Sequence, residues 1–280
     1  MKKFELDSYV INGSSKSIKS NQEIFDSYLE SRELYNKLPK KLKGAEAKKR
    51  LFREVCTSKY SNHLFRKKAD TSDALVNYWL GSVKNLATIF ELVTHLPDFT
   101  TLTKEDLIEI AQHSHDINYL KRIDKVLNQK GIIFIIEQSI PGLKTDGAAF
   151  KLASGRPVIA MSLRYKRIDS FWFTLMHELS HIVLHYDLLD NYIVDDLDED
   201  NKSITELQAD RLSQDTLIPR GLWRTSDARR FPSEENVHEF SRENNIHPAI
   251  VAGRIQREKS NFKILSNIVN EIDMREFFQG

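Results

Sequence analysis

Residues 171–186 read FWFTLMHELSHIVLHY, and this stretch decides the fold because its polar and apolar residues separate at helical spacing. With a step of about 100° per residue, the apolar side chains cover most of the circumference of a helix. The remaining slot holds five polar side chains: Thr174, His177, Glu178, His181 and His185. A helix that is apolar on nearly every side is buried, and buried polar groups need partners. The stretch therefore predicts a core helix with one polar slot.

His177 and His181 lie one helical turn apart in this slot, so both imidazoles point the same way. This spacing suits two corners of a tetrahedral zinc site. Glu178 lies beside the pair rather than in line with it, so its carboxylate can act as a general base without becoming a ligand. A hydrolytic zinc site needs ligands, a base and an open coordination position. The alternative is that the histidines only form hydrogen bonds within the core.

The third ligand does not come from the same helix. The extended motif HExxHxxGxxH needs glycine and histidine where this chain has Leu184 and Asp187, which excludes that class of zinc protein. His185 lies one further turn along the slot, too far to share one tetrahedron comfortably, so we expect a structural role for it.

A second helix, residues 203–210 (SITELQAD), supplies a carboxylate. Glu206 and Asp210 share one face of it. We expect Glu206 to bind Zn²⁺ and Asp210 to accept a hydrogen bond from the outer ring N–H of a ligand histidine. Ser203 and Glu206 also fit a capping box, in which Glu206 would fold back onto its own helix terminus. We favour ligation, because the metal otherwise lacks a third protein ligand.

A small β-sheet is expected just before the metal-binding helix. Residues 132–136 (IIFII) form a β-branched run of strand length. Residues 148–152 and 157–163 flank a short turn and predict a β-hairpin. We expect the second strand of this hairpin to offer an edge for an extended substrate.

Helical patterns fill the chain from Asn21 to about Leu127, with Thr103 as the N-cap of one helix. The fold class is therefore α+β. We divide the chain into a helical N-terminal region (1–125), an α+β domain with the metal site (126–260) and a C-terminal helical tail (261–280).

Composition and charge limit the remaining possibilities. Cys56 is the only cysteine, which excludes an internal disulfide and a Cys-based zinc cluster. No signal peptide or membrane-spanning run is recognisable, so we expect a cytoplasmic protein without membrane contact. Residues 37–68 contain twelve lysines and arginines against two acidic residues. This basic run is either a solvated surface or a contact for nucleic acid or an acidic partner.

Together these features resemble the ImmA/IrrE family of zinc metallopeptidases, in the subgroup similar to HigA-like antitoxin and regulator fusions. The resemblance covers roughly residues 65–260, and its motifs are residues 164–181, Glu206 to Asp210 with residues 217–219, residues 146–149, and residues 247–254. It implies a zincin-like fold, with His177, His181 and Glu206 as ligands and Glu178 as base. It also implies cleavage of a regulatory protein, a repressor or antitoxin, in a stress, phage-defence or mobile-element circuit.

This chain departs from that subgroup in one respect. Such relatives begin with a helix-turn-helix of the XRE type, and residues 1–60 lack its apolar spacing and its turn glycine. A second helix-turn-helix-like stretch, residues 237–256, falls in the family's C-terminal region, where we expect it to pack. The alternative function is an antitoxin-like regulatory or sensor module that binds a toxin partner or DNA, with a structural or vestigial zinc site.

Overall fold

The fold is described from a computed structural model, which places residues 21–57, 71–190, 193–194 and 203–278. Its centre is a mixed sheet of strand order β1-β3-β2-β4. The strands are β1 (Ile133–Ile136), β2 (Gly147–Lys151), β3 (Pro157–Met161) and β4 (Ile193–Val194). β1 runs parallel to β3, whereas β2 is antiparallel to both β3 and β4. The predicted α+β class and the predicted β2–β3 hairpin are confirmed.

One expectation about this sheet is wrong. β3 was expected to offer a free edge, but it pairs with β1 on one side and β2 on the other, so its backbone groups are already used. Pro157, the residue that suggested an edge, stands at the first position of the strand, where a missing N–H is tolerated. Both β2 and β3 pack against the helix of residues 168–185, which carries two of the candidate metal ligands.

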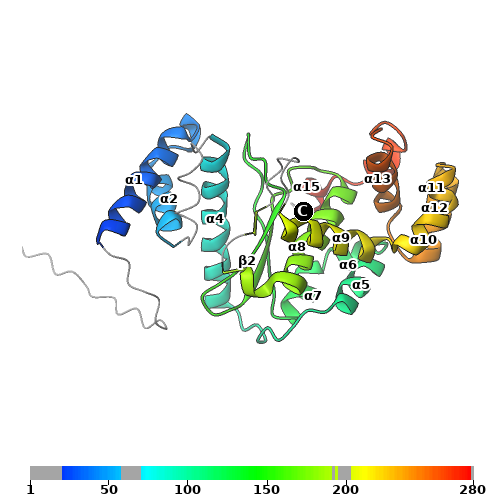
Figure 1. The fold of residues 1–280 in the computed structure, drawn as a ribbon, viewed down its shortest axis with the longest axis horizontal. Coiled ribbons are helices and arrows are strands. Elements are labelled where there is room, and N and C mark those ends of the chain that lie inside the picture. The colour runs from blue at the N-terminus through cyan, green and yellow to red at the C-terminus, as the bar shows by residue number, and fades with distance from the viewer. Residues whose placement is uncertain (1–20, 58–70, 191–192, 195–202, 279–280) are drawn as a thin grey trace, which may run out of the picture.

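Both faces of the sheet are covered by helices, which explains why its strands are apolar except for Lys151 at the end of β2. On one side lie α1 (Asn21–Lys37), α2 (Ala45–Thr57) and α4 (Thr71–Val93), and α4 packs directly against β1. Ala148 and Phe150 of β2 point to this side, and the intervening Ala149 points to the other, as the pleat requires. Figure 1 shows α4 and α8 (Ile168–His185) on opposite sides of the sheet.

The face opposite α4 carries the larger core, built around α8. It includes α5 (Lys104–Gln112), α6 (Ile117–Leu120) and α7 (Ile123–Gln129), whose buried residues cluster with those of α8. The predicted cap at Thr103 is present: its hydroxyl accepts from the Asp106 N–H, and the Asp106 carboxylate accepts from the Thr103 N–H. Helices on both sides of the boundary drawn near residue 125 thus share one core, and the proposed domain division stays a prediction.

The C-terminal third completes this core, and its segment of residues 220–258 forms the end of the molecule opposite α1 (Figure 1). The helices of the C-terminal third are α9 (Ile204–Leu217), α10 (Arg220–Thr225), α11 (Asp227–Arg230), α12 (Glu234–Asn244), α13 (Pro248–Glu258), α14 (Ser266–Val269) and α15 (Met274–Phe277). Asn245 adopts a left-handed conformation (φ 52°) that ends α12, and His247 caps α13. α13 packs against α8, with Ile250, Val251 and Ile255 fully or almost fully buried.

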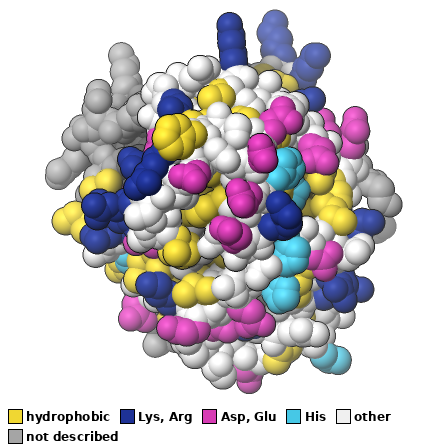
Figure 2. Space-filling model, turned by 90° about the vertical axis from the view of Figure 1, so that its right-hand side faces the viewer, with side chains coloured by type: hydrophobic (Ala, Val, Ile, Leu, Met, Phe, Trp, Pro, Cys, Tyr) yellow, Lys and Arg dark blue, Asp and Glu magenta, His cyan; other side chains and the backbone are white. Residues whose placement is uncertain are grey.

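This end of the molecule does not offer a basic face. Figure 2 views it directly and shows acidic side chains lying among lysines, arginines and histidines. The exposed acidic residues on α11 and α12 are Asp227, Glu234, Glu235, Glu239 and Glu243. Arg229, Arg230 and Arg242 are exposed on the same two helices, so the charge of this surface is mixed, and the expectation that residues 237–256 pack rather than read DNA stays a prediction. Among the described residues, no helix is long and apolar enough to cross a membrane.

Candidate metal centre

Helix α8 places the predicted slot against α9. The two helices share the most extensive packing of any pair of elements in the part of the chain described here. His177, Glu178 and His181 are 7%, 1% and 1% exposed, and Glu206 of α9 is 8% exposed. Ala209 is fully buried, and its small side chain lets α9 approach α8 closely. The polar slot of α8 is therefore closed by α9, the helix predicted from residues 203–210.

Three side chains direct donor atoms at one point between the helices. His177 Nε2 lies 3.0 Å from His181 Nε2, and the Glu206 oxygens lie 3.1 Å from His177 Nε2 and 3.4 Å from His181 Nε2. A tetrahedral zinc ion with bonds of about 2.05 Å needs donor atoms about 3.3 Å apart. His177, His181 and Glu206 therefore match zinc both in the chemistry of their donor atoms and in spacing.

Asp210 lies behind the first of these histidines. Its Oδ1 is 3.0 Å from His177 Nδ1. Because a carboxylate accepts but cannot donate, the proton of a neutral His177 ring is held on Nδ1, and Nε2 presents its lone pair to the metal position. The structure thus brings Asp210 to the place expected for it.

The position of Glu206 distinguishes the two roles expected for it, metal ligand and member of a capping box. Ser203 caps α9 by accepting a hydrogen bond from the Glu206 N–H at 3.2 Å, as a capping box requires. The Glu206 carboxylate, however, is turned toward the imidazoles of α8. Ser203 therefore acts as the helix cap, while the Glu206 side chain is placed for ligation.

Burial also favours the form of histidine that binds metals. Burial lowers the pKa of His181 below its usual value, and hydrogen bonding to Glu206 opposes this effect only in part. A neutral imidazole offers the lone pair that a metal needs. Less of the free energy of metal binding is therefore lost to removing a proton from the ring.

Glu178 lies under the backbone of β2. A Cβ atom added to Gly147 would come within 2.6 Å of Glu178 Oε1 and 2.8 Å of Thr174 Cγ2. Only glycine allows this close approach of strand and helix. Glu178 is therefore confined between α8 and the start of β2.

The start of β2 is itself held by groups that the residue patterns did not single out. Arg164 donates to Asp146 through Nε at 2.7 Å and through Nη2 at 3.3 Å. The Ser162 hydroxyl donates to the Thr145 carbonyl at 2.7 Å. These contacts join the segment before Gly147 to the loop between β3 and α8. No spacing rule links residues so far apart in the sequence, and only the resemblance had pointed to Asp146.

His185 and Gln208 also belong to this region. His185 lies behind His181, on the side away from Glu206, and it is outside the cluster of three possible ligands. Its place in the slot was visible from the spacing of α8. The sequence did not predict a role for Gln208, because an exposed glutamine on a helix is common.

A comparison with protein families adds to this geometry. Residues 131–255 match the IrrE N-terminal-like domain, which belongs to a family of metallopeptidases. The match begins just before β1 and ends within α13, so it includes the whole sheet, α8 and α9. No curated protein matches the chain.

Proposed function

We propose that this chain, which carries an IrrE N-terminal-like domain of the ImmA/IrrE family at residues 131–255, is a zinc-dependent endopeptidase. The observation that carries the proposal is the buried group of His177, His181 and Glu206, with Glu178 on the same helix as the histidines. A structural metal site has no use for a confined carboxylate beside its ligands, whereas a hydrolytic site requires one.

Four residues of the protein would bind the metal ion and orient its ligands. His177, His181 and Glu206 hold the ion, and Asp210 orients the His177 ring. Zinc bound there supplies a Lewis acid that makes water more acidic and polarises the carbonyl of the scissile bond. Three protein residues would hold the ion, the number found in catalytic rather than structural zinc sites.

Glu178 would act as general base and then as general acid. Its carboxylate takes a proton from the attacking water and delivers it to the leaving amine of the peptide bond. Gly147 and Thr174 restrict where this carboxylate can lie. The confinement supports a role in which Glu178 must meet the reacting atoms in one orientation.

The substrate class rests on the family resemblance. We propose a single regulatory protein, a repressor or antitoxin, in a stress, phage-defence or mobile-element circuit. We place this activity in the cytoplasm, since the single cysteine leaves no role for disulfide chemistry.

A comparison of wild type with Glu178→Gln tests the activity. Both proteins are expected to bind about one zinc ion, because Glu178 is not among the three candidate ligands. Cleavage of a proteome-derived peptide library, and of regulators encoded next to the gene, is measured by mass spectrometry of new termini. We expect cleavage by wild type and a loss of about 10²–10⁴-fold in the variant.

The second candidate function, an antitoxin-like binding module, is favoured by one observation. Exposed lysines follow the edge of the N-terminal helices, at Lys40, Lys41, Lys43, Lys48 and Lys49. If wild type binds zinc, cuts neither the library nor the regulators, and shifts an operator fragment, this second function replaces the first.

A further inference from the structure

We propose that His185 and Gln208 form a hydrogen-bonded relay that sets the tautomer of His181 and so controls its affinity for the metal. Both are positioning residues, since they act through His181 and do not contact the metal position. The inference rests on the proposed function, because it assumes that zinc binds between α8 and α9.

The relay is defined by two contacts in a row, one between two imidazoles and one between an imidazole and an amide. His181 directs Nε2 to the metal position and Nδ1 to His185, whose Nδ1 is 3.2 Å away. His185 Nε2 lies 2.9 Å from Gln208 Oε1. His185 is 7% exposed, so its ring has little access to water that could replace these partners. Its position on the outer nitrogen of His181 also excludes it from the coordination shell.

The position of the proton on His181 determines the position of the proton on His185. Only one proton can lie between the two Nδ1 atoms. When His181 Nε2 binds a metal, its proton is on Nδ1 and is donated to His185 Nδ1. His185 then carries its own proton on Nε2, and Gln208 must accept this proton through Oε1, as the contact between them allows.

The same contacts describe a second, metal-free state. If the Gln208 amide turns and donates to His185 Nε2, His185 donates from Nδ1 to His181. His181 then carries its proton on Nε2, where it is donated to His177 Nε2, 3.0 Å away. That proton blocks the metal position. Zinc binding and relay direction are therefore linked, and the partner at position 208 biases the equilibrium between the two states.

The two histidines are thus supported differently. His177 is backed by Asp210, which can only accept and holds the ring in its metal-binding tautomer. His181 is backed by a neutral relay that can run in either direction. An acceptor-only side chain at position 208 should therefore favour the metal-bound state, and a side chain without hydrogen bonds should favour neither.

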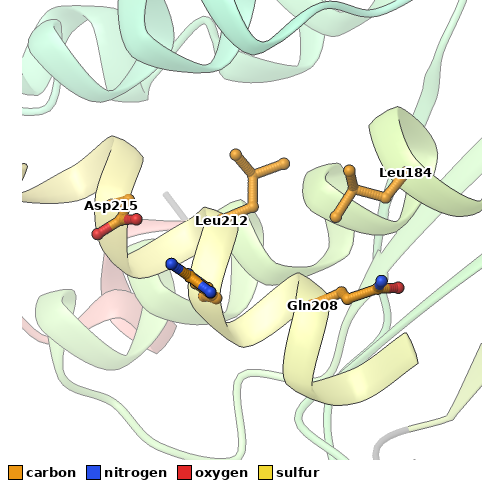
Figure 3. A pocket seen from close by; sticks show the side chains of 5 residues that line it. Leu184, Gln208, Leu212 and Asp215 are labelled. Atoms are coloured by element: carbon orange, nitrogen blue, oxygen red, sulfur yellow. The ribbon is translucent and has the colours of Figure 1, made fainter. Parts of the chain in front are cut away.

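Gln208 is well placed for a test that leaves the fold intact. It is exposed on α9 and borders an open depression whose other lining residues are Leu184, Arg211, Leu212 and Asp215. Figure 3 shows Gln208 extending from α9 toward the end of α8 that carries Leu184. Gln214 is exposed on the same helix and provides a matched control position.

The experiment measures zinc affinity of the full chain by competition with a chelator. Gln208→Leu removes the partner of both states and is expected to leave zinc affinity close to that of wild type. Gln208→Glu, whose carboxylate can only accept, is expected to bind zinc about 10-fold more tightly than wild type, the lower end of the effect of a group that hydrogen-bonds a metal-bound histidine. Gln214→Leu and Gln214→Glu are controls for hydrophobicity and charge on α9, and both should match wild type.

The tautomers provide a readout that general packing would not move. Imidazole ¹⁵N spectra of the zinc-loaded wild type should show His185 protonated on Nε2, and spectra of the metal-free protein should show it protonated on Nδ1. Equal zinc affinity in wild type and Gln208→Glu, or the same His185 tautomer in both states, overturns the relay. A wild type that binds no zinc instead refutes the proposed function.

Discussion

The close contact between Gly147 and Glu178 leads to a prediction that separates catalysis from metal binding. In Gly147→Ala, the new methyl carbon would lie 2.6 Å from Glu178 Oε1 and 2.8 Å from Thr174 Cγ2. A displacement of about 0.8 Å restores an ordinary contact of 3.4 Å with the carboxylate oxygen. Glu178 is 1% exposed, so neither it nor the neighbouring helix has space for this movement without disturbing the core.

The displacement should reduce catalysis far more than metal binding. A misplacement of about 1 Å can reduce a rate by about 10²-fold, because the base no longer meets the reacting atoms in line. We therefore expect cleavage of the best library peptide to fall about 100-fold in Gly147→Ala. Zinc affinity should remain that of wild type, since the three atoms nearest to the added methyl group belong to Glu178 and Thr174 and not to a candidate ligand.

The assay compares the rate of peptide cleavage and the zinc dissociation constant in wild type, Gly147→Ala and Gly221→Ala. Gly221 is the matched control, because a Cβ atom there has nothing within 4 Å. Rates are measured well below each melting temperature, since overpacking at Gly147 is expected to cost about 1–3 kcal/mol of stability. Wild-type cleavage by Gly147→Ala would refute the confinement of Glu178, and a parallel loss of zinc would show that the whole site had been disturbed.

Three further outcomes are expected. Glu206→Ala should weaken zinc binding far more than Asp210→Asn, for which a loss of about 10-fold is expected; equal losses would return Glu206 to a capping role. Gly253→Ala should lower the free energy of unfolding by about 1–3 kcal/mol in urea titrations, because a Cβ atom would lie 2.8 Å from Asp169 Cγ; an unchanged midpoint would contradict this. Burial lowers the pKa of His247 from 6.5, so the stability contributed by its neutral capping ring is present above pH 6.5 and is lost as the pH falls. Unfolding at pH 7.5 and 5.5 should therefore show a smaller acid loss in His247→Asn, and equal losses would rule this out.

Much of the metal centre was visible in the sequence for a local reason. His177, Glu178 and His181 lie within five residues on one helix, so the helical step alone determines their relative directions. Glu206 and Asp210 share a face of α9 by the same rule. The capping pair at Thr103 and the β2–β3 hairpin are equally local, and both were predicted correctly.

Features that join distant segments needed the tertiary structure. The sequence indicated a hairpin but not that β1 lies beside β3, so the expected substrate edge was assigned to an interior strand. Strand order depends on which apolar faces meet, and β1 and β3 would have looked the same in either arrangement.

The opening stretch, residues 171–186, by itself determined that a buried helix carries two imidazoles and a carboxylate on neighbouring faces. The tertiary structure decided that Glu206 completes the candidate ligand group, that Gly147 lies against Glu178 and that Gln208 contacts His185. The physical reason is that spacing along one helix is set by covalent geometry, whereas contacts between helices and strands are set by how whole faces pack.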